Sequence, residues 1–372
     1  MNLASNEEIL SGIQAWVEIE SQTADASGVN QMMDSVEGLF RNAGASVQRI
    51  PGRDGFADHV SVQSQWGGEE PGILVLSHLD TVHPRGTIED NPFRVEGDRA
   101  YGPGIYDMKG GAYLGFAAYQ SLVQDNQVPP LPIRFLFVSD EEVGSPTSRA
   151  LIERAGDTAK FCLVTEPARY GGKCVTARNG VGRYQLSAHG RPAHSGSQHA
   201  EGRSAIREIA RHILTIEDAT DYARQLTFNI GQVHGGTTDN TVPEHCTARI
   251  DVRGNKLADL EEAEAFLRGL KSHDPDVTLT LTGQINRPPY AKSPEIAALF
   301  EHAKQLAGEV GLVLEDTATG GGSDGSFVAN RVPTLDGLGV NGAGAHTLEE
   351  YLEVSSLQTR MALMRRLFET LQ

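Results

Sequence analysis

The stretch Gly72-Ile73-Leu74-Val75-Leu76-Ser77-His78-Leu79-Asp80-Thr81 decides the fold. Its four consecutive apolar residues after a glycine predict a buried strand, and polar residues follow directly where that strand should end. Residues 133–138 and 161–164 are similar apolar runs, and segments 7–19 and 111–123 carry apolar residues at helical spacing. Helices alternating with buried strands predict an α/β fold around a mixed or parallel sheet.

The sequence pattern changes near residue 178. Strands are expected at 181–189, 225–233, 245–253 and 277–284, and helices at 204–216 and 257–270. This β-α-β-β-α-β order is that of a ferredoxin-like unit. We therefore predict a small domain at 178–288, inserted into a catalytic domain formed by 1–177 and 289–372. Ser145-Pro146 and Ser293-Pro294 are expected to start two helices of the catalytic domain.

Composition excludes several classes of protein. The 372 residues carry 32 Lys and Arg against 49 Asp and Glu, a formal net charge of −17, which argues against nucleic-acid binding and against docking on anionic lipid. No apolar run reaches the roughly 18 residues of a membrane span, and the first residues lack signal-peptide features. Because three scattered cysteines provide no disulfide framework, we expect a reduced, cytoplasmic setting.

Histidines and acids follow the predicted buried strands. His78 and Asp80 follow the first strand, Glu141 and Glu142 the strand at 133–138, and Glu166 the strand at 161–164. Taken singly, each has an ordinary explanation as a polar strand end, a solvated acidic turn or a structural carboxylate. Their coincidence at the rim where open α/β folds bind ligands favours a functional site.

Two loops add further candidates for the same rim. Asp107 lies in a loop rich in Gly and Pro, and His346 lies in a second glycine-containing loop. A loop acid can bridge two metal ions through its two oxygens, although a turn aspartate that caps the following helix is the simpler alternative. Two histidines and three carboxylates without cysteine suit a pair of zinc ions, or cobalt or manganese.

Together the motifs resemble the aminoacylase/glutamate carboxypeptidase family of di-zinc metallopeptidases, over essentially the whole chain. That family includes acetylornithine deacetylase and succinyl-diaminopimelate desuccinylase. The resemblance implies an exopeptidase-type α/β/α sandwich catalytic domain with an inserted lid and dimerisation domain. The matching stretches are SHLDTV (77–82), GPGIYDMKGG (102–111), SDEEVGS (139–145), TEP (165–167), GRPAHSG (190–196), GGGSDGS (320–326) and GAHTLEEY (344–351).

The resemblance also implies a role for each matching residue. Asp80 orients His78, Glu141 is the general base in hydrolysis of an amide bond, and the peptide bond after the bridging aspartate is often cis. His194 reaches into the partner subunit's site to stabilise the oxyanion, which implies a homodimer through the inserted domain. The implied metal ligands are His78, Asp107 as the bridge, Glu142, Glu166 and His346.

The resemblance favours a substrate with a blocked nitrogen and a free carboxylate, because Glu166 is the residue of carboxypeptidases and deacylases at this position. Arg253 and Asn240 match positions that hold the substrate carboxylate, and Gly321 and Gly322 would let the backbone approach the substrate. We predict a carboxypeptidase or amidohydrolase that acts on N-acyl or peptidyl amino acids, with glutamate-like ones first.

Two alternatives remain. One is a deacylase of the acetylornithine or succinyl-diaminopimelate type, and the other is a non-catalytic relative that binds peptides. Arg178 and Arg287 are expected to form salt bridges at the domain junctions, and the sequence assigns no role to His234.

Overall fold

The computed structural model describes residues 3–68 and 70–372, which form two compact units. The larger unit comprises Met1–Ala177, Lys292–Ala318 and Ser323–Gln372, and the smaller unit comprises Arg178–Ala291 and Thr319–Gly322. Compared with the domain boundaries expected from the sequence, the smaller unit extends three residues further and also takes in a short segment near residue 320.

A six-stranded mixed sheet forms the centre of the larger unit, in the order β1-β2-β6-β3-β7-β16. The last four strands run parallel, and β1 and β2 are antiparallel additions at one edge. The α/β fold expected from the sequence is confirmed. The strands are β1 (Ser46–Ile50), β2 (His59–Gln63), β3 (Gly72–His78), β6 (Ile133–Val138), β7 (Ala159–Val164) and β16 (Thr334–Leu335).

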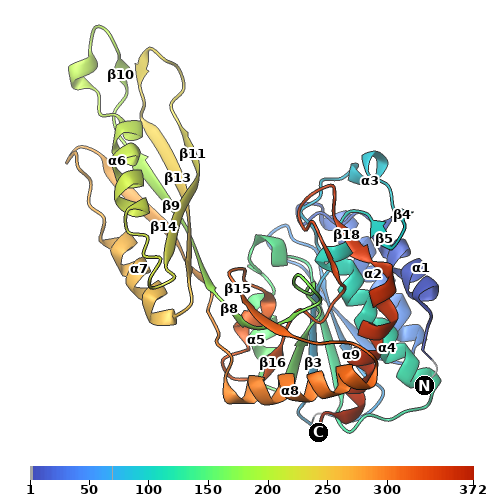
Figure 1. Ribbon diagram of the computed structural model, residues 1–372. Coiled ribbons are helices and arrows are strands. Elements are labelled where there is room, and N and C mark those ends of the chain that lie inside the picture. Colours follow the sequence, from blue (N-terminus) through green and yellow to red (C-terminus); the bar gives the residue numbers. More distant parts are fainter. Residues whose placement is uncertain (1–2, 69) are drawn as a thin grey trace. The chain divides into compact units, whose positions relative to one another are not determined.

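Helices cover this sheet on both faces because its central strands are apolar on both sides. In β3, Ile73 and Val75 belong to one core cluster, whereas Leu74 and Leu76 belong to another, as the alternation of strand side chains requires. Helices α1, α2, α4, α8 and α9 contribute to the first cluster and α5 to the second (Figure 1). The helices are α1 (Asn6–Val17), α2 (Ala26–Asn42), α3 (Thr87–Asp90), α4 (Gly110–Gln124), α5 (Arg149–Gly156), α8 (Pro294–Glu309) and α9 (Leu357–Thr370).

Helix α8 begins where the sequence predicts, since the Ser293 side chain accepts a hydrogen bond from the backbone N–H of Ile296. The predicted helix start at Ser145-Pro146 is wrong, because α5 begins only at Arg149. The buried carboxylate of Asp140 accepts hydrogen bonds from the backbone N–H groups of Thr147 and Ser148 and from both hydroxyls. These bonds hold the segment in a turn, so the helix starts later.

A second sheet of the larger unit carries the loops that contain two of the candidate site residues. Its order is β17-β18-β5-β4. A separate two-stranded sheet pairs β8 with β15 where the chain passes between the two units. The strands are β4 (Arg94–Glu96), β5 (Arg99–Tyr101), β17 (Gly342–Ala343), β18 (Tyr351–Glu353), β8 (Cys174–Arg178) and β15 (Asp316–Thr319).

The smaller unit has the element order expected for residues beyond 178. Its antiparallel sheet has the order β11-β13-β9-β14, and α6 and α7 bury their apolar residues against one face in a core of their own. Two short strands, β10 and β12, pair near one end. The elements are β9 (Gly180–His189), β10 (Ala193–His194), α6 (Ala205–Glu217), β11 (Thr227–Gly235), β12 (Thr241–Val242), β13 (His245–Gly254), α7 (Leu257–Gly269) and β14 (Thr278–Arg287).

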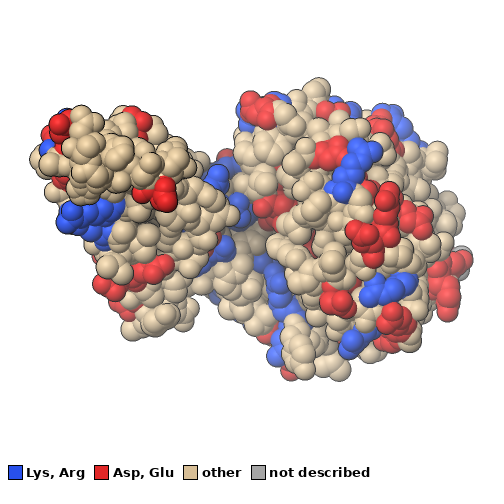
Figure 2. All heavy atoms as spheres, turned by 90° about the horizontal axis from the view of Figure 1, so that it is seen from above, with Lys and Arg blue, Asp and Glu red and all other residues tan. Residues whose placement is uncertain are grey.

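Among residues 3–68 and 70–372, no helix is both long and apolar enough to span a bilayer. The three cysteines are buried free thiols. Figure 2 shows Lys and Arg side chains interspersed with Asp and Glu over the face in view. Since salt screens exposed charges beyond about 8–10 Å, the net charge of −17 matters less for recognition than local side chains do.

Candidate metal centre and active site

Asp107 lies at the centre of the candidate site, between two histidines. Its Oδ1 atom lies 3.2 Å from Nε2 of His78, and its Oδ2 atom lies 3.6 Å from Nε2 of His346. Asp107 belongs to the irregular turn η1 (Ile105–Lys109), and the peptide bond to Met108 is cis. The two oxygens of one loop carboxylate therefore face two different imidazoles.

The site divides into two groups that share Asp107. In the first, Glu166 Oε1 lies 3.8 Å from His78 Nε2. In the second, Glu142 Oε2 lies 3.2 Å from His346 Nε2. The ligand atoms of each group of three lie within 4.8 Å of one another, so each group could hold a metal ion. The structure thus brings together all five residues that the resemblance named as metal ligands.

The donor chemistry of the site fits metal ions of the zinc type. Histidine nitrogens and carboxylate oxygens are the donors that zinc, cobalt and manganese accept. Glu142 Oε1 is buried and has no hydrogen-bond partner among the residues that the structure describes, and a buried unpaired carboxylate oxygen is costly unless a cation or donor meets it.

Proton equilibria in the site respond to the crowded charges. Hydrogen bonds that the His346 ring donates to Asp107 and Glu142 raise the pKa of His346 to about 10. Burial raises the pKa of Glu142 to about 7, although the hydrogen bond from His346 opposes the increase. Burial alone would raise the pKa of Asp107, but hydrogen bonds from His346 and His78 hold it well below its usual range. The carboxylates therefore favour positive charge beside them, which a bound metal ion would supply.

Asp80 contacts both the histidine and the acidic turn. The Nδ1 atom of His78 lies 2.9 Å from the backbone oxygen of Asp80 and 3.5 Å from its Oδ1 atom. The same carboxylate accepts hydrogen bonds from the backbone N–H groups of Glu141 and Glu142, at 3.2 Å each, and from the hydroxyl of Thr23. Asp80 is fully buried, so it fixes the turn η2 (Glu141–Val143) as well as the His78 ring.

Three adjacent acids have different surroundings. Asp140 points into the turn before α5 and is saturated with hydrogen bonds. Glu142 meets His346, and Glu141 is half-buried beside the same cluster, where its charge contributes to raising the pKa of His78. Glu142 therefore belongs to one of the two groups that could hold a metal ion, while Glu141 lies beside the cluster.

Glu350 is the site residue that reasoning from the sequence missed. It is fully buried, and Oε1 accepts the backbone N–H groups of Tyr106 and Asp107, each at 2.8 Å. Its Oε2 atom accepts the N–H of Gly104 at 3.1 Å and lies 2.7 Å from Nε2 of His83. Glu350 therefore holds the loop that carries the central carboxylate. Its position four residues after His346 was the only sequence signal.

The remaining predicted residues belong to the smaller unit. His194 lies in β10, and its Nδ1 atom accepts the backbone N–H groups of Gly196 and Ser197. In the neutral ring this assignment leaves the proton on Nε2. Asn240 lies beside it, because its backbone oxygen accepts the N–H of Ser195. Both are exposed.

Arg253 lies at the other end of the smaller unit, near the C-terminal end of β13. Its guanidinium forms a two-point ion pair with Asp251, at 2.6 and 2.9 Å, and donates to the backbone oxygen of Gly320 at 3.3 Å. The carbonyls of Gly321 and Gly322 accept hydrogen bonds from buried Arg178. Arg178 thus fixes the glycine turn within the smaller unit.

Gly322 has no space for a side chain. A Cβ atom there would lie 2.5 Å from Cδ of buried Arg287, whereas at Gly321 the nearest atoms are 4.0 Å away. His234 is exposed in β11.

Residues 74–370 match Peptidase family M20/M25/M40. The chain belongs to this family. The resemblance seen in the motifs is confirmed, and the protein is a hydrolase of the metallopeptidase type. Carboxypeptidase G2 of Pseudomonas sp. (strain RS-16) is 29% identical over 368 residues, covering 96% of this chain and 88% of that protein. Succinyl-diaminopimelate desuccinylase of Rhodospirillum centenum (strain ATCC 51521 / SW) is 27% identical over 368 residues, covering 93% and 92%.

Solved structures of M20/M25/M40-type enzymes share the fold. The aminopeptidase PepT of Bacillus cereus ATCC 10987 superposes with a TM-score of 0.75 at 22% identity, over 98% of both chains. The M20 family metallo-carboxypeptidase Sso-CP2 of Sulfolobus solfataricus has a TM-score of 0.76 at 15% identity, over 97% of this chain and 98% of that one.

Proposed function

We propose that this member of the M20/M25/M40 family is a di-zinc carboxypeptidase or amidohydrolase. It hydrolyses N-acyl or short peptidyl amino acids that end in a free carboxylate, with glutamate-like substrates preferred. The observation that carries the two-metal part is the position of Asp107, whose two oxygens face two separate His and Glu groups. His78 and Glu166 would hold one ion, Glu142 and His346 the other, and Asp107 both.

The residues of the chain supply the proton transfers of the reaction. Glu141 takes a proton from water as the water oxygen attacks the amide carbonyl carbon, and then passes that proton to the nitrogen of the leaving amine. The C–N bond breaks, and the products are a carboxylic acid and an amine. When bound, the metal ions polarise the carbonyl and stabilise negative charge on its oxygen. Replacement Glu141→Gln should abolish turnover while metal stays bound.

Likeness to carboxypeptidase G2 and the presence of glutamate at position 166 support the choice of substrate. Arg253 and Asn240 are proposed to bind the free carboxylate, because a guanidinium can meet both carboxylate oxygens and an amide adds a donor. Gly321 and Gly322 are proposed to let the backbone approach the substrate. The likeness to succinyl-diaminopimelate desuccinylase supports a second candidate, hydrolysis of a succinyl-diamine.

The layout of the smaller unit supports the proposal of a homodimer. His194 and Asn240 lie beyond the His245 end of β13, and Arg253 lies at the other end. Eight residues of extended strand separate those ends by about 26 Å, which exceeds the reach of a single small substrate. We propose that one subunit contributes Arg253 to a site and the partner contributes His194 and Asn240, with the Nε2 proton of His194 stabilising the oxyanion.

Product release from a panel of N-acyl amino acids tests this proposal. The panel holds N-acyl-glutamate, N-acyl-aspartate, N-acetyl-ornithine, N-succinyl-diaminopimelate and neutral N-acyl amino acids, each incubated with zinc-loaded protein with and without chelator. Release of glutamate that the chelator stops supports the carboxypeptidase. Release only from the succinyl or ornithine compounds refutes it in favour of a deacylase, and no release from any compound refutes both.

A further inference from the structure

A second cluster of metal-type side chains lies in the smaller unit. Glu208 and His212 are one turn apart on α6, so their side chains share a face of the helix. His273 comes from the loop between α7 and β14. One donor atom from each of the three lies within 4.8 Å of the others. The proposed hydrolysis uses none of these residues.

The cluster is buried and closely held. Glu208 and His212 are each 2% exposed. The Oε1 atom of Glu208 lies 3.1 Å from Nε2 of His212 and accepts the backbone N–H of His273 at 2.6 Å and the hydroxyl of Ser272 at 3.2 Å. The rings of His212 and His273 are 4.8 Å apart between centroids. A carboxylate and two imidazoles therefore converge where a helix meets a loop.

One atom in this cluster lacks a partner. Nδ1 of His212 is buried and forms no hydrogen bond within the described part of the chain, and a buried polar atom without a partner is unfavourable. Burial lowers the pKa of His212 despite the neighbouring Glu208, so the ring is neutral, which is the form that binds metals.

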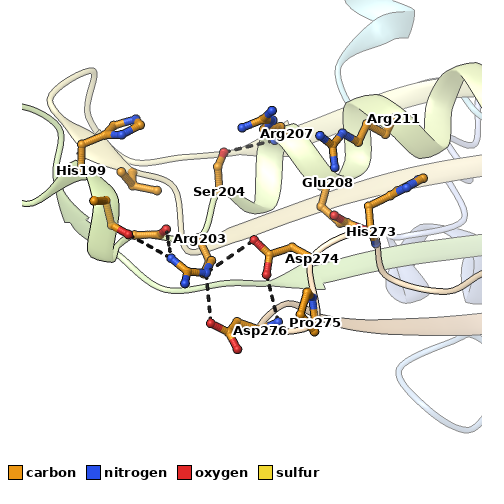
Figure 3. Close-up of a pocket in the computed structure, with 13 residues that line it drawn as sticks. His199, Arg203, Ser204, Arg207, Glu208, Arg211, His273, Asp274, Pro275 and Asp276 are labelled. Carbon is orange, nitrogen blue, oxygen red and sulfur yellow. Dashed lines mark hydrogen bonds and ion pairs between the residues drawn. The ribbon is translucent and has the colours of Figure 1, made fainter.

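Solvent reaches this cluster through a cavity of about 700 Å³ that Glu208 and His273 help to line. Figure 3 shows these two side chains together at one end of the cavity. In the same cavity, Arg203 pairs with Asp274 and Asp276 at 3.5 and 3.1 Å. Those two acids are therefore already ion-paired, whereas Glu208 and His273 line the cavity, from which an ion and the water molecules that complete its coordination can reach them.

We propose that Glu208, His212 and His273 bind a divalent transition-metal ion of the zinc type. Two imidazoles and one carboxylate without a thiolate suit zinc, cobalt or nickel. The ion would connect α6 to the loop before β14, two segments more than 50 residues apart in sequence. It would stabilise the smaller unit and leave the hydrolytic residues of the larger unit untouched.

Zinc counting in the full-length protein tests this inference. The protein is stripped with chelator, reloaded with Zn²⁺, desalted, and analysed for zinc per chain by mass spectrometry. His273→Ala should hold one equivalent less than the wild type, and His212→Ala should lose the same equivalent. Because His273 is exposed, its replacement should leave the fold intact. The zinc content of His273→Ala therefore tests the proposal even if the variant of the buried His212 does not fold.

Two control variants separate this site from nearby histidines. His199→Ala changes an exposed histidine of the same cavity, and His189→Ala changes the exposed cluster of His189, Glu244 and His245. Both should keep the wild-type zinc content. Equal zinc in the wild type and His273→Ala overturns the proposal, as does a loss confined to His189→Ala. The difference in zinc content between these variants does not depend on hydrolysis. Failure of this proposal can therefore be distinguished from failure of the proposed function.

Discussion

Replacing Glu350 should weaken both the larger unit and its hold on metal. In Glu350→Gln, the amide oxygen can still accept from Tyr106 and Asp107, but the NH₂ group faces the N–H of Gly104 and the ring of His83. The His83 tautomer can adapt, whereas the Gly104 N–H cannot. One buried donor without an acceptor costs about 1–3 kcal/mol of unfolding free energy.

Glu350→Ala should cost more, since it removes the acceptor of all four donors at a fully buried position. With water partly filling the space, the loss should be about 3–5 kcal/mol, as for other broken buried networks. Zinc affinity should fall about 10–100-fold in both variants, because partners that orient ligands have effects of that size.

Thermal melting, zinc binding and kcat/KM measure these effects together. We expect the order wild type, Glu350→Gln, Glu350→Ala in both melting temperature and zinc affinity. The neighbouring Glu349→Gln removes a charge from an exposed side chain and should match the wild type. If Glu350→Gln also matched the wild type in stability and zinc affinity, the reasoning about the Asp107 loop would be refuted.

The variants His194→Ala and Glu141→Gln should each be inactive alone, but their co-expression should restore about a quarter of wild-type activity. Half of the dimers are then mixed, and each mixed dimer contains one complete site out of two. Continued inactivity of the mixture would contradict the shared site. Gly322→Ala should destabilise the smaller unit by about 1–3 kcal/mol through overpacking. Gly321→Ala should not, because no atom lies closer than 4.0 Å to the added Cβ. Equal melting temperatures for the two variants would exclude the clash at Gly322. Burial lowers the pKa of His59 in the folded protein, so the unfolded chain binds a proton at this histidine more readily, and the free energy of unfolding decreases as the pH falls below about 6.5. His59→Gln should therefore lose less stability than the wild type between pH 7.5 and pH 5. Parallel losses in the two proteins would show that His59 is not the cause.

The sequence predicts the strand ends of this site well, because buried strands are short, apolar and sharply bounded. His78 is the last residue of such a strand, and Glu142 and Glu166 each follow one after a short turn. The parallel part of the sheet brings these ends to one rim. Asp107 and His346 lie in loops, where the apolar pattern that marks strand ends is absent, so their place at that rim was a weaker expectation until the family motifs were matched.

Contacts between residues far apart in the sequence, which hold the loops of the site in place, could not be predicted from the strand pattern. Glu350 acts on a loop more than 240 residues earlier in the chain, and nothing in the local pattern distinguishes it from the exposed Glu349. The late start of α5 has the same origin, since Asp140 outcompetes the local helix signal of Ser145-Pro146 through side-chain contacts. Such effects depend on which side chains meet after folding.

The double attachment of Asp80 limits how this enzyme can be redesigned. One carboxylate fixes both the His78 ring and the backbone that presents Glu141. A change that moves the histidine to suit a differently sized metal ion would also displace the base. Selection for a new metal should therefore enrich paired substitutions, one at the ligand and one in the acidic turn.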